Sequence, residues 1–164
     1  MAGRRAFVLA FAASTLTACG FELRRAPELR FKTIQLTGFP PRSALAADLR
    51  RNIDASTTTH VVDAAKDAEV VLQALEEERQ KSSVAVTAAN QIREFELRLR
   101  FTFRVRSAVG KDLIAESEIL QRRSLTYTEN NALAKEQEEA FLYRAMQSDI
   151  VSQVLRRLAS VRLV

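Results

Sequence analysis

The chain of 164 residues contains one histidine, one cysteine and four glycines, and each scarcity excludes a class of site. A single histidine, His60, rules out a histidine-rich zinc centre. The glycines are too dispersed for a phosphate-binding loop or a dinucleotide-binding turn, and no GxSxG nucleophile elbow occurs. One cysteine cannot form an intrachain disulfide. We therefore expect none of these common catalytic, nucleotide or metal sites.

Three consecutive acids, Glu76, Glu77 and Glu78, are the remaining candidates for acid–base catalysis. Consecutive charges at the end of a strand are typical of a solvated patch. Only if these carboxylates met in a cleft would a hydrolase be a reasonable interpretation. The sequence thus predicts a protein that is not an enzyme and that needs no cofactor.

The first 18 residues have the pattern of an export signal that is removed. Arg4 and Arg5 form its positive region, and residues 6–16 form its apolar run. This run has about half of the roughly 20 apolar residues that a transmembrane helix needs. We therefore interpret residues 1–18 as a signal peptide.

The signal ends in Leu16-Thr17-Ala18-Cys19, which resembles the lipobox of bacterial lipoproteins. The resemblance implies that the Cys19 thiol receives a diacylglycerol, that the chain is cut before it, and that the new amine is acylated, for example with palmitate. Gly20, rather than Asp, implies an outer-membrane address. Each buried methylene contributes roughly 0.8 kcal/mol, so several acyl chains anchor firmly. The alternatives are a chance match or a buried free thiol.

Removal of the signal lowers the net charge from +5 to +3, since two arginines and no acids are lost. The remaining chain is long enough for one domain, predicted at 31–164 after a lipidated tether at 19–30. A basic chain can bind nucleic acid, but export argues against that partner. The anions of the envelope are phospholipid headgroups, cell-wall polymers and the phosphates of lipopolysaccharide.

The clearest structural pattern lies in residues 93–106, where from Glu94 onward apolar side chains occupy odd positions and mostly charged ones even positions in strict alternation. It predicts a half-buried strand of roughly 40 Å at about 3.3 Å per residue. A turn at 107–112, with Gly110 at positive φ, leads into an antiparallel partner at 113–128. Its alternation slips near residues 120–122, which predicts a bulge there. Shorter strands are predicted at 31–38, 57–63 and 70–75.

Two segments have helical periodicity. In 39–54, Leu45, Leu49 and Ile53 recur every four residues after two prolines at the expected helix start. A long helix is predicted over 132–159 with Asn131 as its cap. Both apolar stripes are buried if the helices cover one face of the sheet. The predicted fold is therefore α+β, a two-layer sandwich of two helices on a mostly antiparallel, about four-stranded sheet whose other face is polar and open.

Taken in order, these features resemble the LptE/RlpB family of lipopolysaccharide-assembly lipoproteins. The similarity rests on the segment around Cys19, the strand at 93–106 with its partner, NNALAKEQEEAF at 130–141 and IVSQVLRRL at 150–158. The resemblance implies a lipid-anchored plug inside the outer-membrane β-barrel of the lipopolysaccharide translocon. It also implies a role in barrel assembly and lipopolysaccharide binding. The alternative function is a structural or pilot lipoprotein of a secretin or efflux complex.

The resemblance implies Lys135 as a lipopolysaccharide contact, and Arg93 as the nearest candidate for an arginine that family members present at the preceding hairpin. A cation in the first turn of a helix faces the unfavourable end of the helix dipole. Either an external anion or the nearby Glu138 and Glu139 must offset this cost. An i,i+4 pair with Glu139 is the alternative to a ligand.

A second basic surface is predicted on the even face of the long strand. The arginines there form two close pairs with about 6.6 Å between the members of each pair, and their guanidinium groups suit phosphate. Their charge could instead be matched by Glu116 and Glu118 across the hairpin or by an acidic barrel wall, and an exposed edge on this strand would favour a protein partner. The candidate residues are Arg98, Arg100, Arg104 and Arg106.

Overall fold

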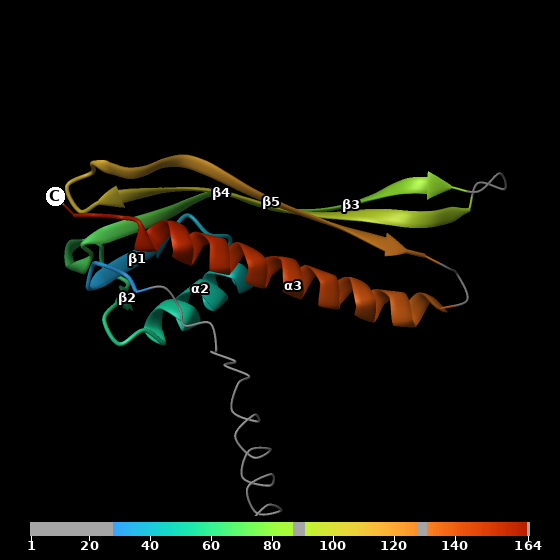
Figure 1. Ribbon diagram of the computed structural model, residues 1–164, viewed down its shortest axis with the longest axis horizontal. Helices are drawn as coiled ribbons and strands as arrows, with labels where there is room; N and C mark the ends of the chain where they lie inside the picture. The colour runs from blue at the N-terminus through green and yellow to red at the C-terminus, as the bar shows by residue number, and fades with distance from the viewer. Residues whose placement is uncertain (1–27, 87–90, 128–130, 164) are drawn as a thin grey trace, which may run out of the picture.

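A computed structural model describes residues 28–86, 91–127 and 131–163 (Figure 1). The predicted signal, Cys19 and most of the tether lie outside these residues. No helix within the described ranges is both long and apolar enough to cross a membrane. The elements are β1 (Thr33–Thr37), α2 (Ala44–Asp54), β2 (His60–Val62), the short 3-10 helix η2 (Ala65–Asp67), β3 (Val70–Val86), β4 (Ile92–Ser107), β5 (Asp112–Thr126) and α3 (Ala132–Ala159).

The strands form one sheet in the order β2-β1-β3-β4-β5. β1 is parallel to both β2 and β3, whereas β3, β4 and β5 are antiparallel neighbours. The predicted four-stranded, mostly antiparallel sheet is thus a five-stranded mixed sheet in the described chain. The difference arises because α2 and the segment 63–69 are crossovers, which return the chain to the same end of the sheet and so make short parallel pairs.

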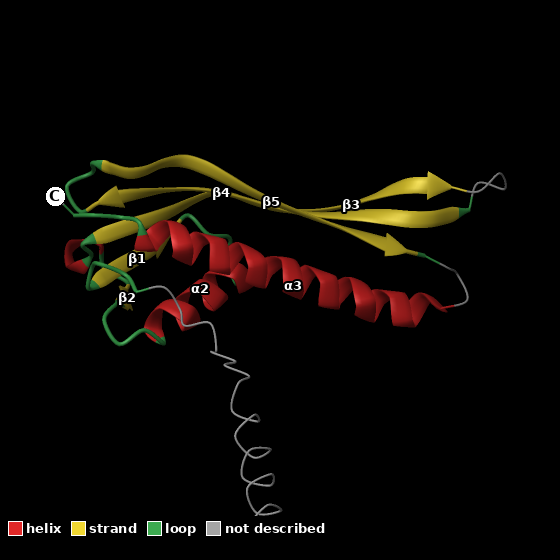
Figure 2. Ribbon diagram, in the orientation of Figure 1, coloured by secondary structure: helices red, strands yellow, loops and turns green. Residues whose placement is uncertain are grey.

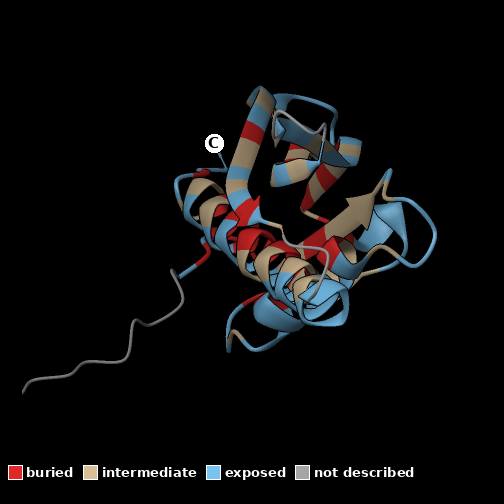
Figure 3. Cartoon of the chain, turned by 90° about the vertical axis from the view of Figure 1, so that its right-hand side faces the viewer, coloured by how far each residue is buried: buried red, intermediate tan, exposed pale blue. Residues whose placement is uncertain are grey.

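Both helices lie on the same side of the sheet (Figure 2), so the predicted α+β class is confirmed. The buried residues, coloured red in the end-on view, lie mainly on the parts of the sheet and helices that face each other (Figure 3). The largest fully buried residues are Phe101, Phe103, Ile34, Leu45, Leu49, Ile53, Leu72, Leu97, Leu99, Leu125, Met146 and Ile150. The periodicity of strand and helices therefore identified most of the core.

β3 extends far beyond the predicted strand at 70–75. A register shift between Ala74 and Glu76 places Leu75 in a bulge and reverses the alternation beyond it. Glu77, Arg79 and Lys81 consequently share the helix-covered face, where each has a side-chain hydrogen-bond partner on a helix or its cap. These contacts, distant in sequence, stabilise a polar strand that local pattern does not reveal.

β4 spans the predicted long strand and lies between β3 and β5, so it has no exposed edge. The predicted bulge at 120–122 is wrong, because pairing there is regular. Two register shifts in β5 lie nearer the turn instead, one between Ser117 and Ile114 and one between Ile114 and Asp112. Gly110 has the predicted positive φ, 85°. The β3–β4–β5 hairpins project beyond β1 and β2, and α3 runs along them (Figure 1).

Helix α3 has the predicted limits, but the Asn131 side chain makes no capping hydrogen bond. Helix α2 begins at Ala44, after the two prolines rather than at them. Ser43 is its cap: the hydroxyl accepts from Ala46 N at 3.0 Å and donates to the Glu77 carboxylate at 2.6 Å. One serine thus caps α2 and fastens it to β3.

Candidate functional site

The predicted binding residues fall on opposite faces of the sheet. Alternation along β4 places Arg98, Arg100, Arg104 and Arg106 on the open face, away from the helices. Arg93 shares the helix-covered face with the odd-numbered residues, and Lys135 lies in the first turn of α3. The structure therefore places Arg93 and Lys135 together at one end of the domain. The other four candidates lie apart from them on the open face.

Three of these four arginines have a close polar partner within the sheet. Arg98 pairs with Glu96, and Arg106 Nε lies 2.8 Å from Asp112 Oδ1. Arg104 Nε donates to Gln73 Oε1 at 2.9 Å. These contacts come from the same or neighbouring strands. Glu96 and Asp112 thus neutralise Arg98 and Arg106, whereas the charge of Arg104 meets only a neutral amide.

Arg100 is the most weakly satisfied member of this row. Its guanidinium lies 3.6 Å from both Glu78 and Glu118, which are across the sheet on either side. Its Nε is buried and has no partner within hydrogen-bond distance. Glu118 thus contributes as predicted, whereas Glu116 makes no ion pair with a described residue.

A cavity of about 140 Å³ lies under the first turn of α3, at the end of the domain far from residue 28. Its floor comes from the long strands, where Phe95 and Tyr127 pack edge to face with ring centres 5.3 Å apart. The Lys81 ammonium lies 4.3 Å from the centre of the Phe95 ring. The lining residues are Lys81, Phe95, Leu125, Tyr127, Ala132, Lys135, Glu136 and Glu139.

The two lysines of this cavity are each paired with a glutamate of α3. Lys135 Nζ lies 2.8 Å from Glu138 Oε2, and Lys81 Nζ lies 2.6 Å from Glu139 Oε2. The predicted pair of Lys135 with Glu139 is therefore wrong, because Lys81 reaches Glu139 from β3. Glu138 offsets the unfavourable position of Lys135 near the helix start.

A second cavity, of about 470 Å³, adjoins the first and shares Glu136 and Glu139 with it. It continues along α3 past Ala140 and Tyr143 to Arg144, with Arg79 of β3 opposite. We call the two cavities together the distal groove. It combines lysine and arginine head groups with aromatic rings, a composition that suits an amphipathic anion.

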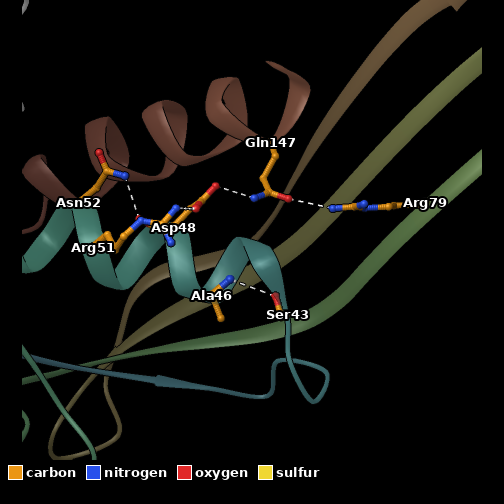
Figure 4. Close-up of polar contacts among 7 residues, drawn as sticks. All are labelled: Ser43, Ala46, Asp48, Arg51, Asn52, Arg79 and Gln147. Carbon is orange, nitrogen blue, oxygen red and sulfur yellow. Dashed lines mark hydrogen bonds and ion pairs between the residues drawn. The ribbon is translucent and has the colours of Figure 1, made fainter. Parts of the chain in front are cut away.

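A polar network holds the wall of this groove (Figure 4). Arg79 donates to Gln147 Oε1 at 2.8 Å, and Gln147 Nε2 donates to Asp48 Oδ2 at 2.5 Å. The network thereby joins β3, α3 and α2. The Arg79 guanidinium also lies 5.4 Å from the centre of the Tyr143 ring.

The Tyr143 hydroxyl donates to the carbonyl of Gln80 at 2.9 Å. Burial raises the pKa of Tyr143 above its usual value; the charge of Glu139 adds to the rise and that of Arg79 opposes it. Tyr143 is therefore a neutral hydrogen-bond donor that fixes α3 against β3.

Arg93 lies at the same end as the distal groove. Its carbonyl accepts from Tyr127 N at 2.8 Å, and its exposed side chain makes no ion pair with a described residue. Sequence reasoning identified Lys135 and Arg93 but missed Arg79, Lys81 and Tyr127. Arg79 and Lys81 could have been found from their alternate spacing, which is typical of cations on one face of a strand.

The three consecutive acids do not converge in a cleft. Pairing along β3 puts Glu76 and Glu78 on the open face, both exposed, and Glu77 on the other face. His60 is exposed on β2. In the part of the chain that the structure describes, no group of three or more His, Cys, Asp or Glu side chains is placed to hold a metal ion.

Comparison with known families matches residues 31–158 to the lipopolysaccharide-assembly family LptE. Among solved structures, the chain is similar to lipoprotein B from Nitrosomonas europaea, with 34% identity, a TM-score of 0.74, and coverage of 86% of this chain and 91% of that one. It has the fold of the rare lipoprotein B from Shewanella oneidensis, with 22% identity, a TM-score of 0.67, and coverage of 79% and 95%. Comparison with curated proteins gave no match.

Proposed function

Because the chain belongs to the lipopolysaccharide-assembly family LptE, we propose that it is a lipoprotein of the outer membrane that binds lipopolysaccharide in the distal groove. In this proposal it also plugs the β-barrel of the lipopolysaccharide translocon and helps that barrel to assemble. Lipid attached to Cys19 anchors it, and it catalyses no reaction. The family match favours this function over a structural or pilot role in another envelope complex.

The observation that carries the proposal is the composition of the distal groove. Lys81 and Lys135 lie beside Phe95 and Tyr127, so phosphate-binding groups adjoin an apolar surface. Lipopolysaccharide presents the same pairing, because phosphates lie next to acyl chains in its lipid A. Arg93 extends the cationic character of this end.

Phosphate must compete with the glutamates that hold the two lysines. The Lys135 side chain is 20% exposed and its partner Glu138 is 47% exposed. Partly exposed pairs of this kind contribute about 0–1 kcal/mol, less than a charge-assisted contact to a phosphate. The pair therefore keeps Lys135 in position when the groove is empty and yields to a phosphate ligand.

Retention of the mature protein on immobilised lipopolysaccharide tests the site. Replacing Lys135 with Asp reverses the charge in the groove, and we expect apparent affinity to fall about tenfold or more, as for loss of one charge-assisted contact. Lys111→Asp, in the exposed turn at the opposite end, makes the same charge change and should leave retention within about twofold of wild type. Equal retention of wild type and Lys135→Asp would refute the role of Lys135.

The open sheet face is the surface that we assign to the barrel wall. Arg98 and Arg106 are paired with acids of the sheet itself and Arg104 has a hydrogen-bond partner in Gln73, so the face can lie against a mixed polar surface whose acidic groups match the remaining charge. A photo-crosslinker at Arg98 in living cells should trap a large outer-membrane barrel protein. Trapping of periplasmic proteins alone would contradict this assignment.

Mass spectrometry of the natural protein tests the anchor. We expect a chain that starts at Cys19, with a diacylglycerol on its thiol and an acyl group on its amine. An intact N-terminal signal or an unmodified thiol would remove the membrane attachment from the proposal without affecting the distal groove.

A further inference from the structure

The end of the domain opposite the distal groove gathers three segments: residues 28–32, the β4–β5 turn at 108–111 and the C-terminal residues 160–163 (Figure 1). We call it the tether end. Glu69 links two of them: its carboxylate accepts from Lys32 N at 2.7 Å, and its carbonyl accepts from Ala108 N at 3.0 Å. The backbone of this end is therefore fixed.

A groove of about 640 Å³ opens at the tether end. The buried side chains of Leu29 and Phe31 form part of its wall, and Leu163, which is 42% exposed, forms part of its rim. At the tip of the neighbouring turn, Val109 is 90% exposed. Apolar side chains are thus presented to the surroundings by two of the three segments.

Exposed cations surround these apolar side chains. They are Arg30, Lys32, Lys111 and Arg162, and none of the four forms an ion pair with a described residue. Of the neighbouring acids, Asp112 is paired with Arg106, and the Glu69 carboxylate accepts a backbone hydrogen bond. The four unpaired cations therefore outnumber Glu28 and Glu69, whereas both lysines of the distal groove are paired with acids.

We propose that the tether end docks on the headgroup surface of a membrane that contains anionic phospholipid. Lysine and arginine near such a surface are attracted by its negative potential, and small exposed apolar groups enter the boundary between headgroups and acyl chains. Arg30, Lys32, Lys111 and Arg162 supply the attraction. Val109 and Leu163 supply the apolar contact.

The length of chain before residue 28 supports this partner. Eight residues, 20–27, separate Cys19 from Glu28, so a fully extended tether spans at most about 30 Å. With Cys19 lipidated, as the proposed function has it, the tether end stays within that distance of the bilayer. A low affinity of the tether end for lipid headgroups is then enough for binding, because the local concentration of headgroups is high.

Docking at the tether end also determines how far the distal groove lies from the docked leaflet. β4 has 16 residues and is therefore about 50 Å long, close to the roughly 40–45 Å thickness of a bilayer with its headgroups. A domain that rests on one leaflet by its tether end thus carries the distal groove across a distance comparable to the whole membrane. The two ends would meet different lipids.

Vesicle co-sedimentation tests this inference on the mature chain with Cys19→Ser, which removes the lipid. We expect binding to vesicles of phosphatidylglycerol with phosphatidylcholine and none to phosphatidylcholine alone. The double variant Lys32→Gln/Lys111→Gln should bind the anionic vesicles about 25-fold more weakly, at roughly fivefold per cation. The control Arg42→Gln/Arg122→Gln removes two exposed cations that lie outside both the tether end and the distal groove, and it should bind within about twofold of wild type.

Equal losses in the two double variants would show attraction by net charge alone and would overturn the inference, as would no binding of the wild type. Circular dichroism should show unchanged folding for both. Retention on lipopolysaccharide, measured in parallel, separates this inference from the proposed function. Vesicle binding lost with lipopolysaccharide retention intact is the expected result for Lys32→Gln/Lys111→Gln. Loss of both would assign these lysines to lipopolysaccharide binding and refute membrane docking.

Discussion

Gln147→Leu removes the centre of the network that joins both helices to β3. Gln147 is 5% exposed, accepts from Arg79 and donates to Asp48, so leucine of similar size leaves both charged groups without this partner. Hydrogen bonds to charged groups contribute about 1.5–3 kcal/mol each. Because water reaches parts of Arg79 and Asp48, and Asp48 keeps Arg51, we expect a loss of about 2–3 kcal/mol for the two together. The Tm should fall by about 5–10 °C.

Urea unfolding of the mature chain, followed by circular dichroism, measures this cost. Gln73→Leu is the matched control, since Gln73 also accepts from an arginine, Arg104, but on the open face of the sheet. Water can replace that contact, so the control should cost less than about 1 kcal/mol. Equal costs for the two variants, or a stabilising Gln147→Leu, would refute the view that this network fastens the helices to the sheet.

Three further predictions follow from single side chains. Glu138→Gln frees the lysine that it pairs with, so affinity for lipopolysaccharide should rise about two- to fivefold in the retention assay; an unchanged affinity would show that the pair does not compete with phosphate. Gly38→Ala should destabilise the fold by about 3 kcal/mol or more in urea unfolding, because φ is 77° and a Cβ would lie 2.2 Å from a backbone carbonyl oxygen. Gly110→Ala is the control: φ is 85° but the surrounding space is open, so this variant should cost only about 1–2 kcal/mol. Because the pKa of Tyr143 is raised in the folded state, the unfolded chain loses its phenolic proton first, and stability should decline as pH rises above about 10. Tyr143→Phe should weaken that decline. An identical pH profile of stability for the two proteins would contradict this prediction.

The parts of the fold that the sequence predicted are those in which local period and burial agree. Strict alternation located β4, and repeats of three and four residues located α2 and α3 with their buried faces. Each of these elements presents one continuous apolar face. Burial of that face is the dominant stabilising term, so the pattern is visible without knowledge of the partners.

The second half of β3 could not be predicted in this way. Its helix-facing residues are Glu77, Arg79 and Lys81, and their partners Ser43, Gln147 and Glu139 lie 34, 68 and 58 residues away. A bulge at Leu75 also breaks the alternation. Polar contacts between distant segments leave no periodic pattern in the sequence. The strand was therefore predicted to end before its acidic residues.

The distal groove was predicted only in part for the same reason. Lys135 stood out because a cation near a helix start needs a compensating charge. Lys81 lies on β3, Phe95 on β4 and Tyr127 just after the end of β5, and only the pairing register brings them under α3. Burial of the long strand predicted its odd face as core and gave no sign that its first aromatic residue, Phe95, lines a cavity.

Photo-crosslinking to lipopolysaccharide in living cells tests the central claim most directly. Glu136 is exposed and lines both cavities of the distal groove, whereas Val109 lies on the turn at the tether end. A crosslinker at position 136 should capture lipopolysaccharide, and one at position 109 should not. No capture at position 136, or equal capture at both positions, would contradict the assignment of the distal groove as the lipopolysaccharide-binding site.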